Sequence, residues 1–63
     1  IYNNQENFKL IGEGILNFDN KNYPASIKAF DSVLESDPEN IVALYHKANT
    51  YFEQNKYDDA MDI

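Results

Sequence analysis

Apolar residues recur along this chain at the spacing of amphipathic helices. Ile27, Phe30 and Leu34 stand at positions i, i+3 and i+7, which places them on one face of a helix. Similar spacing in the neighbouring stretches predicts four helical segments, over residues 7–20, 23–36, 41–54 and from Tyr57 onward. Because each such helix has one apolar face to bury, the pattern predicts an all-α chain whose helices pack against one another.

Turn-forming residues separate these segments. Pro38 has no amide hydrogen and disfavours helical geometry at Asp37, so the second helix must end there. Asn40 is a favourable N-cap for the third helix, and Pro24 fits the first turn of the second. Residues 55–56, Asn followed by Lys, are expected to form the turn that precedes the fourth helix.

The two halves of the chain match each other at a shift of thirty-four residues. When residues 8–29 are laid over residues 42–63, three identical pairs fall on the apolar skeleton: Leu10 with Leu44, Phe18 with Phe52 and Tyr23 with Tyr57. Matches at a fixed period indicate an internal repeat. The chain therefore divides into an N-terminal extension, a first repeat, and a second repeat truncated in its second helix, at residues 1–6, 7–40 and 41–63.

Several positions of this repeat carry the residue types of a known family. Each unit has a small residue inside its first helix (Gly14, Ala48) and an aromatic residue where its second helix opens (Tyr23, Tyr57), and the first unit closes with Asp-Pro. In these features the chain resembles the tetratricopeptide repeat. The resemblance covers residues 7–63, about 1.7 repeats, and implies antiparallel helix-turn-helix units stacked into an α-solenoid. The first unit departs from the family's usual residues at Leu10, Glu13, Asn17 and Lys21.

Gly14 and Ala48 are the positions at which the two helices of each unit are expected to approach most closely. Residues this small allow the axes of packed helices to come together. Replacing Ala48 by Leu is therefore expected to overpack the second helix pair.

A second apolar stripe lies on the first helix of the first unit, beside the face that carries Leu10 and Gly14. In tetratricopeptide repeats, residues of this kind line an inner groove that binds partner proteins, so the resemblance implies a protein-interaction module. The groove would be built from Phe8, Ile11, Ile15, Phe18, Val42, Tyr45, His46, Asn49 and Phe52. The residues alone leave another interpretation open, in which the stripe packs internally against the N-terminal residues or the second helix.

Charge and composition narrow the class of partner. The 63 residues include 5 Lys, no Arg and 11 acidic residues, for a formal net charge of −6, so nucleic acid and anionic membranes would be repelled. The chain has no cysteine, no apolar run long enough to span a membrane and no signal-peptide core. We therefore expect a cytoplasmic protein, and its first residue, which is not Met, leads us to expect a piece of a longer chain.

Two features raise the question of catalysis or metal binding. Asp58, Asp59 and Asp62 copy the spacing of aspartate-rich magnesium motifs, but acidic residues also suit the first turn of a helix. His46 is the only histidine and has no carboxylate one helical turn away. We therefore expect no enzyme, and neither a metal nor a cofactor.

The apolar surface of the second unit is expected to need a further partner. Four residues lack the helix that would cover them in a complete repeat: Leu44, Ala48, Tyr51 and Phe52. About 300 Å² of exposed apolar surface forfeits roughly 7 kcal/mol, which is comparable with the whole stability of a small domain. We therefore expect a homodimer, formed mainly by Phe8, Ile11, Ile15, Phe18, Tyr45 and Phe52. The alternative function is that of a structural unit that stacks on copies of itself or on further repeats.

Overall fold

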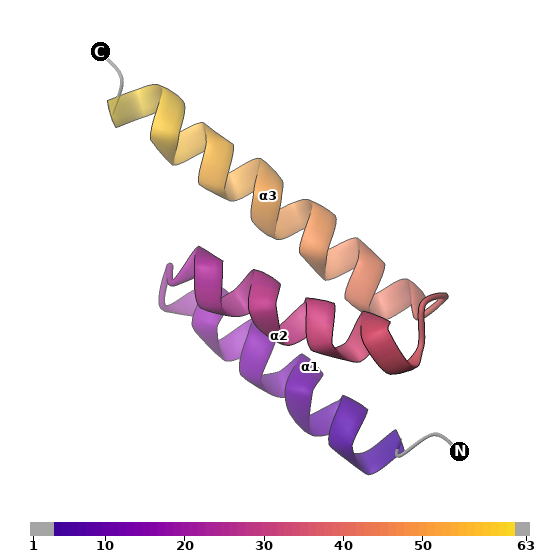
Figure 1. The fold of residues 1–63 in the computed structure, drawn as a ribbon. Helices are drawn as coiled ribbons and strands as arrows, with labels where there is room; N and C mark the ends of the chain where they lie inside the picture. The colour runs from indigo at the N-terminus through magenta and orange to yellow at the C-terminus, as the bar shows by residue number, and fades with distance from the viewer. Residues whose placement is uncertain (1–3, 62–63) are drawn as a thin grey trace.

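The computed structural model describes residues 4–61, with side chains placed for residues 5–56. This part of the chain forms three helices, α1 (Asn4–Asp19), α2 (Tyr23–Ser36) and α3 (Ile41–Met61), shown in Figure 1. No strand occurs among residues 4–61, and the predicted all-α class is confirmed. The first helix begins earlier than the sequence pattern predicts, since α1 already includes Asn4.

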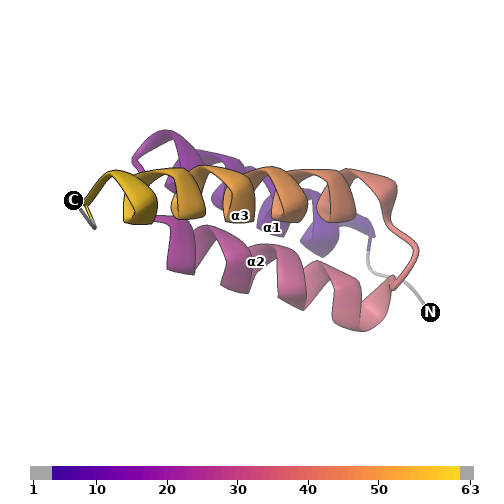
Figure 2. The same cartoon turned by 90° about the horizontal axis from the view of Figure 1, so that it is seen from above.

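The helices are arranged as an antiparallel pair with a third helix added. α2 runs back along α1, and α3 runs back along α2, so that α1 and α3 point the same way (Figure 1). α2 packs against both of the other helices, whereas α1 and α3 contact each other only weakly. Figures 1 and 2 both show the C-terminal part of α3 extending past the turn between α1 and α2.

The turn between α1 and α2 depends on an unusual backbone conformation. Lys21 has φ 63°, in the left-handed region that side chains with a Cβ rarely adopt, at a position where the family usually has glycine. Asn22 occupies the N-cap of α2 without a side-chain capping bond, and Pro24 stands in the first turn as predicted. The chain thus turns sharply here although a glycine is absent.

The turn between α2 and α3 follows the prediction closely. α2 ends at Ser36, and the Asp37 N–H donates to the Val33 carbonyl at 2.9 Å, which closes the last turn before Pro38. Asn40 caps α3, because its Oδ1 accepts a hydrogen bond from the Ala43 N–H at 3.0 Å.

The prediction of a turn at residues 55–56 is wrong, because α3 is one continuous helix from Ile41 to Met61. Asn55 and Lys56 contain neither the proline nor the glycine that would oblige a helix to stop. The position thirty-four residues after Pro24 is Asp58, which a helix accommodates.

The core lies where α2 meets its two neighbours. Phe30, Val33 and Ala43 are completely buried there. Four apolar residues pack against them from a partly buried position: Leu10, Ile11, Ile15 and Leu34. Ser26 and Thr50 are also fully buried, so the centre of this small stack is partly polar.

The predicted close approach between the helices of the first unit is confirmed at Gly14. A Cβ built on Gly14 would lie 2.5 Å from Phe30 Cε1, a distance that real side chains do not adopt. The corresponding prediction for Ala48 is wrong, because Ala48 is exposed. Its expected neighbour was the second helix of the second unit, and the straight course of α3 places no helix against that face.

Candidate functional site

The predicted groove residues come from the two helices that run in the same direction. α1 supplies Phe8, Ile11, Ile15 and Phe18, and α3 supplies Val42, Tyr45, His46, Asn49 and Phe52. We call these nine residues the groove face. Because α1 and α3 both pack against α2, the two rows of side chains are held by a common support.

Three aromatic residues of the groove face are strongly exposed. The exposed fractions are 74% for Phe8, 65% for Tyr45 and 64% for Phe52. Val42 and Asn49 are also exposed. Exposed aromatic side chains of this size are uncommon on a surface that contacts only water, and they often mark a protein-binding site.

The other apolar members of the groove face are partly used for internal packing. Ile11 and Ile15 pack against the buried core, which corresponds to the internal interpretation that the sequence left open. The Phe18 ring meets the Tyr23 ring edge-on, with 5.6 Å between the ring centroids. These three residues of α1 are half-buried, and we call them the half-buried floor of the groove face, whose exposed aromatic members are Phe8 on α1 and Tyr45 and Phe52 on α3.

A hollow lies at the N-terminal end of the groove face. It has a volume of about 280 Å³ and is lined by Asn7, Phe8, Ile11 and Asn40. Asn7 Oδ1 accepts a hydrogen bond from Ser36 Oγ, and Asn40 Oδ1 caps α3. Both carboxamides are therefore held in place by the turn between α2 and α3, and they add polar groups to an apolar hollow.

His46 takes part in an aromatic cluster. Its ring stacks on Phe30 with 5.5 Å between centroids and a 13° interplanar angle, and Tyr45 meets it edge-on at 5.4 Å. The half-buried imidazole thus joins the core to the exposed Tyr45 side chain. This position suits a contact residue better than a proton-transfer group, since no described carboxylate is bonded to the ring.

A second exposed apolar surface lies on α3, and it consists of Ile41, Leu44, Ala48, Tyr51 and Phe52, which we call the α3 stripe. The exposed fractions are 79% for Ile41, 47% for Leu44 and 46% for Tyr51. The expectation that Leu44, Ala48, Tyr51 and Phe52 lack a covering helix is confirmed within the described residues. Phe52 belongs to both surfaces because it stands between them.

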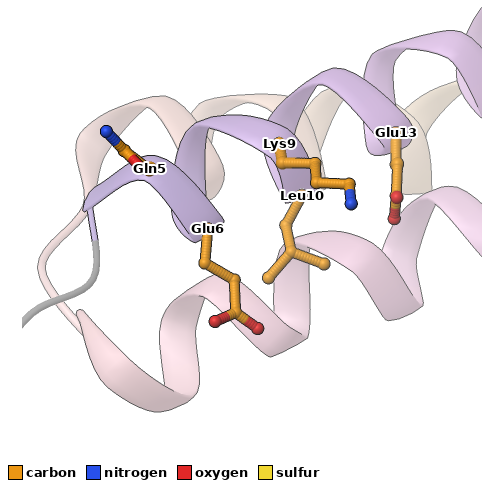
Figure 3. Close-up of a pocket in the computed structure, with 5 residues that line it drawn as sticks. All are labelled: Gln5, Glu6, Lys9, Leu10 and Glu13. Carbon is orange, nitrogen blue, oxygen red and sulfur yellow. The ribbon is translucent and has the colours of Figure 1, made fainter.

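A second hollow, on α1, was not anticipated from the sequence. It measures about 440 Å³ and is lined by Gln5, Glu6, Lys9, Leu10 and Glu13, all on α1 (Figure 3). Figure 3 shows the Leu10 side chain directed toward α2, with Glu6 and Glu13 on either side. Mostly polar residues on one helix give no sequence signal for a hollow. The arrangement of these side chains does not indicate catalysis or the binding of a particular ligand.

The described part of the chain contains no metal centre of protein ligands. Among residues with placed side chains, no three His, Cys, Asp or Glu residues come together in a way that could hold a metal ion. The side chains of Asp58, Asp59 and Asp62 lie outside the described residues. Of the described helices, none combines the length and apolar character needed to cross a membrane.

Comparison with known proteins identifies the family. The family model of the tetratricopeptide repeat matches residues 17–63, which is most of the chain. Searches of curated proteins and of solved structures find no significant match. The family match omits most of α1, where Leu10 and Glu13 depart from the family's usual residues. The division of the repeats at residue 40 stays a prediction. With its antiparallel helices, its close contact at Gly14 and this match, the chain belongs to the tetratricopeptide repeat family.

Proposed function

We propose that this chain is a non-enzymatic protein-interaction module that binds a segment of a partner protein along the groove face. Tetratricopeptide repeats generally serve as protein-interaction modules and are typically scaffolds without catalytic activity. The observation that supports the proposal best is the strong exposure of three aromatic rings on the groove face, those of Phe8, Tyr45 and Phe52.

Aromatic residues in this position can supply most of the binding free energy. Covering a large apolar side chain is worth roughly 1.5–3 kcal/mol, and a few such anchors dominate most protein interfaces. Tyr45 is the strongest candidate anchor, because its ring already rests against the His46 ring and loses little freedom on binding.

The charge of the chain favours an apolar partner segment with basic neighbours. The formal net charge of −6 gives the surface a negative potential that attracts Lys and Arg and repels Asp and Glu. The polar groups of Asn7 and Asn40 at the N-terminal hollow can accept or donate hydrogen bonds to the backbone of an extended segment.

Matched peptides test this proposal directly. Two peptides with the same apolar sequence, flanked by Lys in one and by Glu in the other, are titrated into the chain at low salt while amide chemical shifts are followed. We expect the basic peptide to bind more tightly and to shift the resonances of Phe8, Tyr45 and Phe52. Tighter binding of the acidic peptide would overturn the electrostatic part of the proposal.

A matched pair of variants tests the location of the site. Tyr45→Ala removes an exposed ring from the groove face, and Tyr51→Ala removes an exposed ring from the other side of α3. We expect only Tyr45→Ala to weaken the binding of the basic peptide. If both variants weaken it equally, the groove face is not the binding site.

Absence of catalysis is part of the same proposal, and a titration with Mg²⁺ or Zn²⁺ checks it. We expect no saturable chemical-shift response at Asp58, Asp59, Asp62 or His46. A saturable response there would favour a metal-dependent role instead.

Self-assembly is a second candidate function, and the α3 stripe is the observation that favours it. The stripe is apolar and exposed, and it lies apart from the half-buried floor of the groove face. A surface of this kind suits stacking on a further copy or on a further repeat.

A further inference from the structure

The α3 stripe faces away from the rest of the molecule. Ala43 and Thr50 are completely buried and mark the side of α3 that packs against α2. At about 100° of rotation per residue, Ala48 lies roughly opposite both of them. The stripe is therefore a continuous surface of α3 that no other described element covers.

We propose that two copies of the chain associate through this stripe, with their α3 helices antiparallel and a two-fold axis at Ala48. The proposal rests on the second candidate function, self-assembly, and the stripe shares only Phe52 with the groove face. Association of like surfaces about a two-fold axis is the commonest form of homodimer, and it requires a surface that is complementary to itself.

The residues of the stripe meet this requirement. In an antiparallel pair centred on Ala48, Leu44 lies opposite Phe52 of the second copy, and Phe52 lies opposite Leu44. Larger side chains thus flank the axis on both sides, while Ala48 meets Ala48 at the axis itself. A residue this small at the crossing point lets two helices approach closely. α1 and α2 approach each other closely for the same reason, because Gly14 has no side chain to collide with the Phe30 ring.

The exposed area is sufficient for a specific interface. A large apolar or aromatic side chain offers about 150–250 Å², and Ile41, Leu44, Tyr51 and Phe52 are exposed by between 46% and 79%. Together they present on the order of 500 Å² in each copy, or about 1,000 Å² in a symmetric pair, which reaches the lower limit of specific protein interfaces.

The charge distribution of the stripe is compatible with a second copy. Each chain carries a formal net charge of −6, so two copies repel each other, and an uncharged contact surface limits this repulsion because no like charges meet there at short range. The five residues of the stripe are all uncharged, and Asn55, which follows on the same side of α3, is uncharged as well. The described carboxylates closest in sequence to the stripe are Glu39 and Glu53, which stand outside it.

Sedimentation equilibrium of the 63-residue chain from micromolar to millimolar concentration is the first test. We expect a reversible monomer–dimer equilibrium for the unaltered chain. A folded species that stays monomeric over the whole range would overturn the proposal, and the stripe would then belong to another helical segment or to a different partner protein.

Two matched substitutions test the position of the interface. Ala48→Glu places two carboxylates together at the axis, and it should weaken association about tenfold or more. Asn49→Glu adds the same charge to the neighbouring exposed residue, which belongs to the groove face, and should leave association nearly unchanged. Equal effects of the two substitutions would overturn the proposed interface. Circular dichroism verifies that each variant is helical, as expected for Glu at an exposed helical position.

A mixture of two variants tests the symmetry. Chains with Ala48→Glu and chains with Ala48→Lys should each associate weakly alone, whereas their mixture should form a mixed dimer because opposite charges meet at the axis. A mixture that associates no more tightly than its components would exclude Ala48 from the axis. Binding of the basic peptide by the Ala48→Glu variant is measured in parallel, so that failure of the dimer and failure of the groove are distinguished.

Discussion

Ser26 Oγ donates a hydrogen bond of 2.7 Å to the Gly14 carbonyl, and this buried contact joins α2 to α1. The Thr50 hydroxyl of α3 lies 3.5 Å from the same Ser26 Oγ. Thr50 Oγ1 donates its only proton to the His46 carbonyl at 2.6 Å, and Ser26 donates its only proton to Gly14. The long contact between the two hydroxyls is therefore a polar packing contact, and all three helices meet at one point.

Removing the Ser26 hydroxyl should destabilise the fold. Ser26→Ala deletes the interhelical hydrogen bond while preserving the small size of the residue, and we expect a loss of about 1 kcal/mol in the free energy of unfolding. Urea denaturation followed by circular dichroism measures the change. Ser32→Ala is the control, because Ser32 Oγ bonds only to the Lys28 carbonyl of its own helix. Equal stability of Ser26→Ala and the unaltered chain would mean that the buried bond contributes nothing net.

Replacing either of the two glycines of α1 by Ala should change the stability of the fold, but in opposite directions. Gly14→Ala places a methyl group 2.5 Å from Phe30 Cε1 and Cζ, and the Phe30 ring is fully buried and stacked on His46. Overpacking of this kind typically costs 1–3 kcal/mol, which exceeds the gain of about 1 kcal/mol that Ala brings to a helix. We expect the melting temperature to fall.

Gly12→Ala provides the matched control, because a Cβ built there has no neighbour within 4 Å. We expect this variant to gain roughly 0.5–1 kcal/mol from helix propensity alone. A Gly14→Ala variant as stable as Gly12→Ala would show that the helices of the pair are farther apart than described.

The parts of the fold that local chemistry determines could be predicted from the sequence. α2 ends before Pro38 because proline lacks an amide hydrogen. α3 begins after Asn40 because the Asn40 side chain accepts a hydrogen bond from the backbone N–H of Ala43. Gly14 could be identified as a contact point because the repeat places it opposite the second helix of its unit.

The parts that depend on a distant partner could not be predicted. Residues 55–56 permit either a turn or a helix, and the choice is decided by whether another helix is present to pack against α3. The exposure of Ala48 follows from the same choice. The internal packing of Ile11 and Ile15 could not be separated from a groove role, because both require apolar residues on the same side of α1.

The N-cap of α3 should contribute more to stability than the N-cap of α2. Asn40 Oδ1 accepts the Ala43 N–H at 3.0 Å, and loss of such a cap costs about 1 kcal/mol, so Asn40→Ala should lower the urea midpoint. Asn22→Ala is the control, because Asn22 makes no side-chain capping bond and Pro24 already favours the first turn of α2. If both variants lose the same free energy of unfolding, the capping bond of Asn40 is not the cause.

The ion pair between α2 and α3 should give the chain an alkaline pH dependence. Lys47 Nζ donates to Asp31 Oδ1 at 2.6 Å, and this hydrogen bond raises the pKa of Lys47 above its ordinary value. A group whose pKa is higher in the folded state stabilises the fold below its unfolded pKa, and the stabilisation is lost as the pH rises through the folded pKa. The contribution of the pair should therefore be constant at neutral pH and decline above about pH 10.4, the unfolded value for lysine.

Comparison of Asp31→Asn with the unaltered chain isolates this contribution, since the two chains differ only at the carboxylate that pairs with Lys47. The exposed fractions of the Lys47 and Asp31 side chains are 30% and 50%, so solvent screens the pair and we expect a difference of only about 0.2–1 kcal/mol at pH 8. The difference should shrink in high salt, and it should vanish as the pH rises through the raised pKa of Lys47 in the folded chain. Glu35→Gln, which removes an exposed carboxylate from the same helix, is the control for net charge and should show no such alkaline decline. A difference that grows with pH would mean that the pair does not raise the Lys47 pKa.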